Sequence, residues 1–148
     1  MRLSTKGRYA VMAMVDLAGT GRDVPVTLAG IAERQEISLA YLEQLFAKLR
    51  KEGLVRSVRG PGGGYRLARA PERMRISDII LAVDEPVRAT RCDGAASGCR
   101  TDGSRCLTHD LWEELGNRIH LYLSSVTLAD VVARRVSGPD AGRAEAAE

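Results

Sequence analysis

The sequence predicts a mostly α-helical protein with a small β-hairpin wing: a winged helix-turn-helix followed by a long C-terminal dimerisation helix. Two helical patterns joined by a short turn precede two short alternating segments around the run RGPGGG at 59–64, which is the order of elements in a winged helix. A long apolar stripe follows after residue 108. The 148 residues give room for one domain and one oligomerising appendage.

Capping residues and glycines mark the ends of the first helices. Apolar residues recur at helical spacing over 4–19, and glycines follow this segment. Thr27 is a suitable N-cap for a short helix over 28–35, and Ser38 can cap the next helix by accepting a bond from an early backbone N–H. Gly53 can end that helix in a left-handed conformation. The turn EIS between these helices completes the helix-turn-helix.

The glycine-rich run lies between two strand patterns. Residues 54–58 and 65–69 alternate as short strands do, and Pro61 with the glycines after it permits a tight turn. A phosphate-binding nucleotide loop is the alternative, but the run lacks the required Lys and Ser/Thr, and no helix follows it. We therefore expect a hairpin. A short helix comes next, with Ser77 as its expected N-cap.

The segment 108–126 is the longest helix candidate, and its apolar stripe extends beyond the winged helix. A second copy of this helix is the simplest cover for the stripe, because a two-fold dimer is self-complementary. Thr127 and Asp130 form a capping-box pattern for one further helix, and the polar tail at 137–148 is predicted to be disordered. The stripe consists of Leu111, Leu115, Ile119, Tyr122, Leu123 and Val126.

Basic charge is concentrated in the first half of the chain. Residues 1–75 carry 14 Lys and Arg against 7 Asp and Glu, a net of +7; residues 76–148 carry 8 against 12, a net of −4, and the sum is +3. A basic half favours a polyanionic partner, of which nucleic acid is the commonest. The helix after Ser38 has an apolar side and a side of small, amide and cationic residues. That second side suits a DNA major groove, although an ordinary solvated face is the alternative. Arg59 at the hairpin tip can enter a minor groove.

All three cysteines lie in one glycine-rich loop. Cys92, Cys99 and Cys106 are followed by His109, with the spacing C-x6-C-x6-C-x2-H. Thiolates and imidazole bind borderline and soft metals, and three cysteines cannot all pair within one chain. Zinc sites favour tighter spacing, whereas iron–sulfur clusters usually have four cysteine ligands, so both remain open, as does a thiol redox switch.

Several classes of protein are disfavoured. No apolar run approaches the roughly 18 residues of a membrane span, and we expect no membrane partner. A signal peptide at the basic N-terminus is disfavoured because Asp16 interrupts an apolar stretch of helical spacing. We therefore expect a cytoplasmic protein with reduced thiols. No nucleophile with a base and no paired carboxylates support an enzyme.

Four stretches carry a resemblance to a known family. MRLSTKGRYAVMAM, ISLAYLEQLFAKLRKEGLVRSVRGPGGGYRL, AVDEPVRATRC and CLTHDLWEEL resemble the IscR family of bacterial iron–sulfur cluster regulators, and the similarity runs from residue 1 to about 135. It implies a homodimeric winged-helix transcription factor with one [2Fe–2S] cluster per subunit, ligated by Cys92, Cys99, Cys106 and His109. In such regulators the loaded form represses genes of cluster biogenesis, and the clusterless form still binds a second class of promoter.

The resemblance also implies DNA-binding residues and partners. The partners are double-stranded DNA with palindromic promoter operators, and the cluster-assembly machinery as cluster donor. Glu43 looks like a gate against one promoter class, because a carboxylate is repelled by acceptor-rich base edges and phosphates. Two departures are a cysteine loop one residue longer in each gap and Ala40 where Ser is common in the family. The DNA-binding residues implied are Ser38, Tyr41, Glu43, Gln44 and Arg59.

Together these expectations divide the chain into functional segments. Residues 1–75 form the winged-helix DNA-binding domain, and 76–90 a short helix and connector. The cluster-binding loop takes 91–109, the dimerisation helices 108–135, and the tail 137–148.

Overall fold

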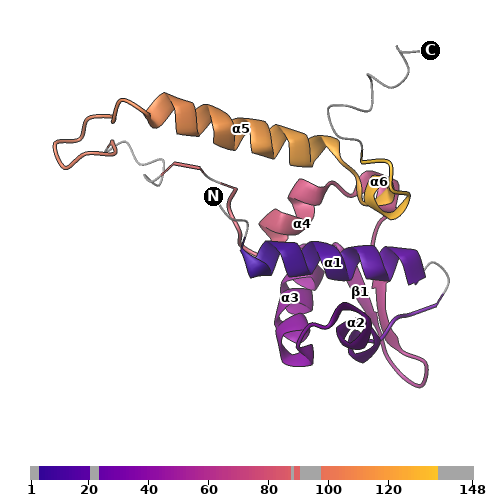
Figure 1. Ribbon diagram of the computed structural model, residues 1–148. Helices are drawn as coiled ribbons and strands as arrows, with labels where there is room; N and C mark the ends of the chain where they lie inside the picture. Colours follow the sequence, from indigo (N-terminus) through magenta and orange to yellow (C-terminus); the bar gives the residue numbers. More distant parts are fainter. Residues whose placement is uncertain (1–3, 21–23, 88, 91–97, 137–148) are drawn as a thin grey trace, which may run out of the picture.

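The computed structural model describes residues 4–20, 24–87, 89–90 and 98–136. The described chain is mostly helical with one antiparallel hairpin, which confirms the predicted fold class (Figure 1). In chain order, the elements are α1 (Thr5–Thr20), α2 (Leu28–Gln35), α3 (Leu39–Lys51), β1 (Val55–Val58), β2 (Gly64–Leu67), the 3-10 turn η1 (Pro71–Arg73), α4 (Ile76–Ala82), α5 (His109–Ser125) and α6 (Leu128–Val132).

The helix-turn-helix forms where the capping residues predict it. The Thr27 hydroxyl accepts a bond from the Gly30 N–H at 3.1 Å, and the Ser38 hydroxyl accepts one from the Tyr41 N–H at 3.3 Å. Both caps satisfy backbone donors that a helix start leaves unpaired. Gly53 has φ +73° just after α3, so its left-handed conformation is also confirmed.

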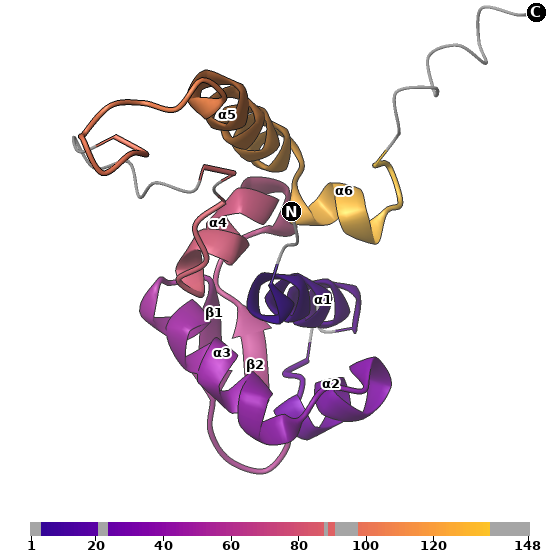
Figure 2. The same ribbon diagram turned by 60° about the vertical axis from the view of Figure 1, so that its left-hand side comes forward.

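One face of α3 closes the core. Its Leu42, Leu45, Phe46 and Leu49 are buried against α1, α4 and the hairpin. The rings of Phe46 and Tyr65 meet edge to face with centroids 5.0 Å apart. Because the apolar face points inward, the opposite face of α3 is presented to solvent (Figure 2).

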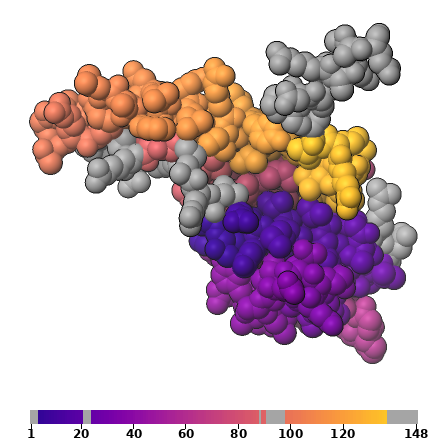
Figure 3. Space-filling model, viewed as in Figure 1, coloured from indigo at the N-terminus to yellow at the C-terminus, as the bar shows by residue number. Residues whose placement is uncertain are grey.

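The wing is shorter than the sequence predicts but pairs as expected. β1 and β2 are antiparallel, with Val55 opposite Leu67 and Val58 opposite Gly64. Tyr65 exchanges backbone hydrogen bonds of 2.9 and 2.7 Å with Val26, so the segment before α2 fixes the base of the wing. The turn of the hairpin projects from the body of the molecule (Figure 3).

The prediction that Ser77 caps α4 is wrong. Ser77 lies inside the helix and is buried, and the Asp78 carboxylate caps the helix by accepting the Arg75 N–H at 3.0 Å. The Ser77 hydroxyl instead accepts a bond from the Ser124 hydroxyl at 3.0 Å. Ser77 therefore joins α4 to α5, a tertiary role that local spacing does not reveal.

Helix α5 extends along the outside of the molecule on α4, and α6 returns to α1 (Figures 1 and 2). The capping box of α6 is confirmed, because Asp130 N–H donates to Thr127 Oγ1 at 3.1 Å and Thr127 N–H donates to Asp130 Oδ2 at 3.0 Å. Leu128 is fully buried, and its N–H donates to the Met74 carbonyl at 2.8 Å. The tail at 137–148 lies outside the described residues.

Candidate metal centre and DNA-binding face

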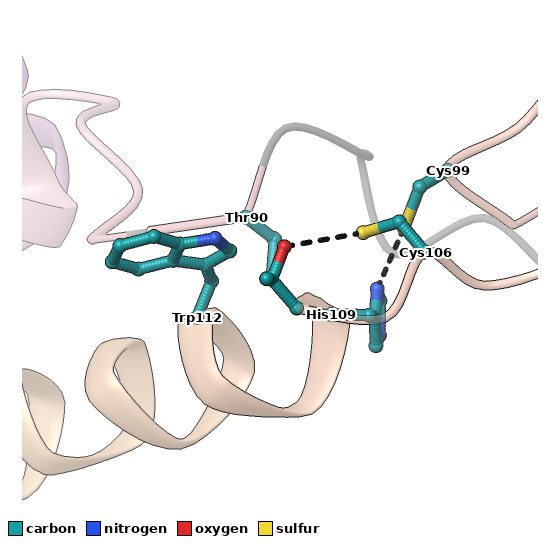
Figure 4. Close-up of a pocket in the computed structure, with 6 residues that line it drawn as sticks. Thr90, Cys99, Cys106, His109 and Trp112 are labelled. Carbon is teal, nitrogen blue, oxygen red and sulfur yellow. Dashed lines mark hydrogen bonds between the residues drawn. The ribbon is translucent and has the colours of Figure 1, made fainter.

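The loop before α5 and the first turn of α5 form a pocket of about 370 Å³. Two of the predicted sulfur ligands and the predicted histidine face it from different segments (Figure 4). Cys99 comes from the loop, Cys106 from the end of the loop, and His109 from the start of α5. Cys92 lies outside the described residues. The pocket is lined by Thr90, Cys99, Cys106, Thr108, His109 and Trp112.

Cys99 and His109 are in direct contact. The distance from Cys99 Sγ to His109 Nδ1 is 2.9 Å, and Cys106 Sγ lies 3.7 Å from Thr108 Oγ1. The His109 side chain is only 7% exposed, whereas both cysteines are partly exposed. The ring is thus held in place while the sulfur atoms stay accessible from the pocket.

The described part of the loop is a small hydrogen-bonded turn. The Gly98 N–H donates to the Gly103 carbonyl and the Arg100 N–H to the Ser104 carbonyl, both at 3.1 Å. A Cβ on Gly98 would overlap the Ser104 carbonyl oxygen, so the close approach of the backbone at residue 98 to the backbone at Ser104 requires glycine. Asp102 accepts bonds from the Ser104 hydroxyl and N–H, and these bonds lower the pKa of Asp102. This turn sets the position of Cys99 relative to α5.

Nε2 of His109 faces a carboxylate that the sequence analysis missed. Nε2 of His109 lies 3.9 Å from Glu113 Oε1, one helical turn further along α5. His109, Asp110 and Glu113 offer ligand atoms within 4.8 Å of one another. The i, i+4 spacing of His109 and Glu113 on a helix is the signal that could have found this pair. The His109 ring therefore has a thiol at Nδ1 and a carboxylate near Nε2.

The predicted DNA-binding residues occupy the outer side of α3 and the wing. Glu43 and Gln44 are exposed on α3, and Arg59 is exposed in the hairpin turn. Ser38 caps α3, as above. Tyr41 is half-buried, and its ring meets Tyr9 of α1 at 6.0 Å, so part of its surface supports the helix-turn-helix.

The turn after α4 contacts both α3 and α1. Lys48 Nζ lies 2.7 Å from Asp84 Oδ2, and this hydrogen bond with its attraction lowers the pKa of Asp84. The next residue, Glu85, accepts the Ser4 N–H through Oε1 at 2.6 Å. Gly7 leaves the space for this carboxylate, since a Cβ there would overlap Glu85 Oε2. The segment that leads into the cysteine loop is therefore attached to α3 and to the start of α1.

Several apolar side chains of α5 are exposed, whereas Leu123 and Val126 of the predicted stripe pack against the core. Leu111, Trp112, Leu121 and Tyr122 remain accessible in the single protomer, with Leu121 66% exposed. Of these, Leu111 and Tyr122 lie on the same side of the helix, where they are candidates for an interaction surface. Among the described helices, none is long and apolar enough to cross a membrane.

Known proteins resemble the chain over almost its whole described length. The family model of Rrf2, an iron-dependent transcriptional regulator, matches residues 3–134. The helix-turn-helix transcriptional regulator IscR of Yersinia pestis is 58% identical over 132 residues, which cover 89% of this chain and 79% of the relative.

Solved structures agree with this match. IscR of T. potens superposes with a TM-score of 0.73 at 42% identity and covers 92% of this chain and 89% of its own. CymR, the global cysteine regulator of B. subtilis, superposes with a TM-score of 0.74 at 32% identity, covering 90% and 98%. These relatives are named as regulators, in agreement with the expectation that the chain is not an enzyme. The chain belongs to the Rrf2 family of iron-dependent transcriptional regulators and is an IscR-like helix-turn-helix transcriptional regulator.

Proposed function

We propose that this regulator senses cellular iron–sulfur cluster status through a bound [2Fe–2S] cluster and represses genes of cluster biogenesis. Cys92, Cys99, Cys106 and His109 are the proposed ligands, and the cluster-assembly machinery is the proposed donor. The observation that carries the proposal is the 2.9 Å contact of Cys99 Sγ with His109 Nδ1 in a pocket that Cys106 also lines.

The donor set fits such a cluster. Iron–sulfur clusters are held by thiolates, and histidine replaces cysteine in some [2Fe–2S] centres. Two ligand atoms of one tetrahedral metal are about 3.6 Å apart at ordinary metal–sulfur and metal–nitrogen distances. If Cys99 and His109 bind the same iron, their 2.9 Å contact must therefore lengthen by about 0.7 Å on loading, which a glycine-rich loop permits. Once bound, the cluster would supply a redox-active, visible-absorbing group whose presence reports cluster supply.

Zinc is the second candidate for the same residues. The described donors, two thiols and one imidazole, are also a zinc ligand set, and with Cys92 they would make the Cys₃His site of structural zinc proteins. In that case the loop would hold a structural metal or act as a thiol redox switch, while the DNA-binding part of the proposal would stand.

For DNA binding, we propose that α3 enters the major groove of a palindromic operator and that the wing contacts the adjacent minor groove. The exposed Glu43 and Gln44 would read base edges, with Ser38 and Tyr41 at the start of α3, and Arg59 would enter the minor groove. We propose Glu43 as the gate between promoter classes. If clusterless Glu43→Ala binds the biogenesis promoter no more tightly than the wild type does, the gate is excluded.

The proposed working form is a homodimer. The exposed Leu111 and Tyr122, which share one side of α5, support this helix as the interface, because a second α5 related by a two-fold axis would cover them with the same residues. Two recognition helices then meet two half-sites of a palindrome. The proposed location is the cytoplasm, where thiols stay reduced and available for metal binding.

The first test is an ultraviolet–visible spectrum with iron and sulfide assays on protein purified without oxygen. We expect visible bands with equal amounts of iron and sulfide, and we expect His109→Ala to lose them. His120→Ala is the matched control, because His120 lies on the same helix, exposed and away from the pocket. A colourless protein that contains zinc, or no metal after reconstitution, would overturn the cluster proposal.

A further inference from the structure

His109 contacts different chemistry at each ring nitrogen. Nδ1 faces Cys99 Sγ at 2.9 Å, on the pocket side. Nε2 faces Glu113 Oε1 at 3.9 Å, on the side away from Cys99. The proposed function uses the first nitrogen and leaves the second, with its carboxylate, unexplained.

The Glu113 contact favours one protonation form of a neutral histidine. A neutral imidazole carries one N–H, and the nitrogen that binds a metal must be the one without it. A carboxylate near Nε2 favours the proton at Nε2 and so leaves Nδ1 open to the metal. Metal-binding histidines commonly donate their other N–H to a carboxylate, which fixes the ring and increases its basicity.

Of the carboxylates near the start of α5, Glu113 is the one placed for this role. Asp110 is directed to Arg105, with 3.6 Å between the charged groups, and its side chain is 87% exposed. Glu114 pairs with Arg118 at 2.7 Å. At 3.9 Å from the ring of a neutral histidine, the Glu113 carboxylate is beyond hydrogen-bond distance and acts on the Nε2–H through its charge.

We propose that Glu113 is a positioning residue of the metal centre. It holds the His109 ring with Nε2–H toward the carboxylate and Nδ1 toward the pocket, which slows loss of the cluster and lowers its reduction potential. This inference rests on the proposed function for its metal-loaded consequences. Its claim about the histidine tautomer holds for the protein without a cluster.

The experiment compares Glu113→Ala and Glu113→Gln with Glu114→Gln in the full chain. Glu114→Gln removes the same charge from the neighbouring position without touching His109, so it controls for charge alone. Glu113→Gln keeps an acceptor oxygen without the charge. The readouts on loaded protein are the rate at which a chelator removes iron and the reduction potential. The readout on cluster-free protein is the pair of His109 ring ¹⁵N shifts, which reports the tautomer.

We expect Glu113→Ala to lose iron about tenfold faster than the wild type, the lower end of the effect of such outer partners. The potential should rise more in Glu113→Ala than in Glu114→Gln, and Glu113→Gln should fall between wild type and Glu113→Ala in both readouts. In cluster-free protein, the wild type should show the Nε2–H form, and Glu113→Ala should lose that preference.

Equal rates and potentials for Glu113→Ala and Glu114→Gln would overturn the inference while leaving the cluster proposal intact. A wild type that binds no cluster would overturn the proposed function, and the ring ¹⁵N shifts would still decide the role of Glu113. An Nδ1–H form in the wild type would then refute it, whereas an Nε2–H form lost in Glu113→Ala would support it.

Discussion

The carboxylate of Asp16 joins α1 to α2, and its removal should destabilise the helix-turn-helix. Asp16 Oδ1 accepts from Arg34 Nη2 at 2.7 Å, and Oδ2 accepts from Arg34 Nε at 3.0 Å and from Gln35 Nε2 at 2.8 Å. The Asp16 side chain is 4% exposed, whereas that of Arg34 is 43% exposed. A buried carboxylate thus depends on two side chains of α2, the helix that precedes α3.

The expected loss for Asp16→Asn follows from these contacts. Hydrogen bonds to a charged group contribute about 1.5–3 kcal/mol each. The contribution of the Arg34 hydrogen bonds to stability is smaller than this, because solvent screens the exposed guanidinium and can solvate it once Asp16 is replaced. We therefore expect the free energy of unfolding to fall by about 2–3 kcal/mol. At about 3 °C per kcal/mol for a chain of this size, Tm should fall by roughly 6–9 °C.

The same carboxylate makes this loss depend on pH. Burial alone would raise the pKa of Asp16, but the hydrogen bonds from Arg34, Gln35 and Thr20 and the attraction of Arg34 outweigh it, so the pKa is lowered. A folded pKa below the unfolded value gives stability that is fully present above the unfolded pKa, near about 3.9, and is lost as the pH falls through the folded pKa. The stability difference between wild type and Asp16→Asn should therefore be full in neutral solution and narrow in acid.

The assay is urea unfolding of the cluster-free protein, followed by circular dichroism at one fixed protomer concentration, at about pH 7 and at several acidic pH values. Asp84→Asn is the control, since Asp84 pairs with Lys48 but is 74% exposed, and solvent screens such surface pairs until they contribute little. Asn also tolerates the φ of +58° at that position. A loss in neutral solution no larger for Asp16→Asn than for Asp84→Asn, or a difference that persists unchanged in acid, would refute the reasoning.

Three further outcomes follow from the wing and the pocket. Gly64→Ala would place a Cβ against the Val26 carbonyl oxygen and should lower the free energy of unfolding, measured in urea, by about 1–3 kcal/mol. The control Gly62→Ala has open space around its Cβ and should lose only about 1 kcal/mol, so equal losses would contradict the prediction. Fluorescence of Trp112, the single tryptophan, should fall on cluster loading because it lines the pocket, and no change on confirmed loading would place the cluster elsewhere. Arg59→Gln should flatten the log–log salt dependence of operator binding by about 1, as measured by fluorescence anisotropy, because a guanidinium in the minor groove displaces counterions; an unchanged slope would exclude Arg59 from that groove.

The sequence was most informative where a structure depends on near neighbours in the chain. Thr27, Ser38 and the Thr127–Asp130 box cap their helices as predicted, because a cap involves a side chain and a backbone group two or three residues away. The hairpin also follows from local turn chemistry. The cysteine loop could be chosen as the site from composition alone, since every cysteine lies there.

Contacts between distant segments were not predictable in the same way. Ser77 has the residue type of a cap but bonds to Ser124, 47 residues away. Asp16 interrupts an apolar helical pattern with no sign of its partner, yet it bonds to a side chain 18 residues further on. Such pairs need the relative placement of whole helices, which periodicity does not provide. Glu113 differs, because its relation to His109 is local and was visible in the spacing.

The contacts of the cysteine loop limit how strongly its state can act on DNA within one protomer. The loop is continuous with the winged helix on two sides, through the turn at Asp84 and through α5. On the first side, the turn contacts α3 through the exposed ion pair of Lys48 and Asp84, and solvent screens an exposed pair of this kind. Since a tenfold change in affinity requires about 1.4 kcal/mol, breaking so weak a pair would change DNA affinity by well under that factor per protomer.

On the second side, the Ser77–Ser124 hydrogen bond joins α5 to α4, and the fully buried Leu128 joins α6 to the core. The connection from the cysteine loop through α5 to the winged helix is therefore closely packed. A packed core moves as a unit rather than bending gradually. A much larger effect of the cluster on operator affinity would therefore require a change in how two protomers place their recognition helices on the half-sites. In the proposed dimer such a change would act through the exposed apolar residues of α5, because they lie on the same helix as His109 and begin within one turn of it.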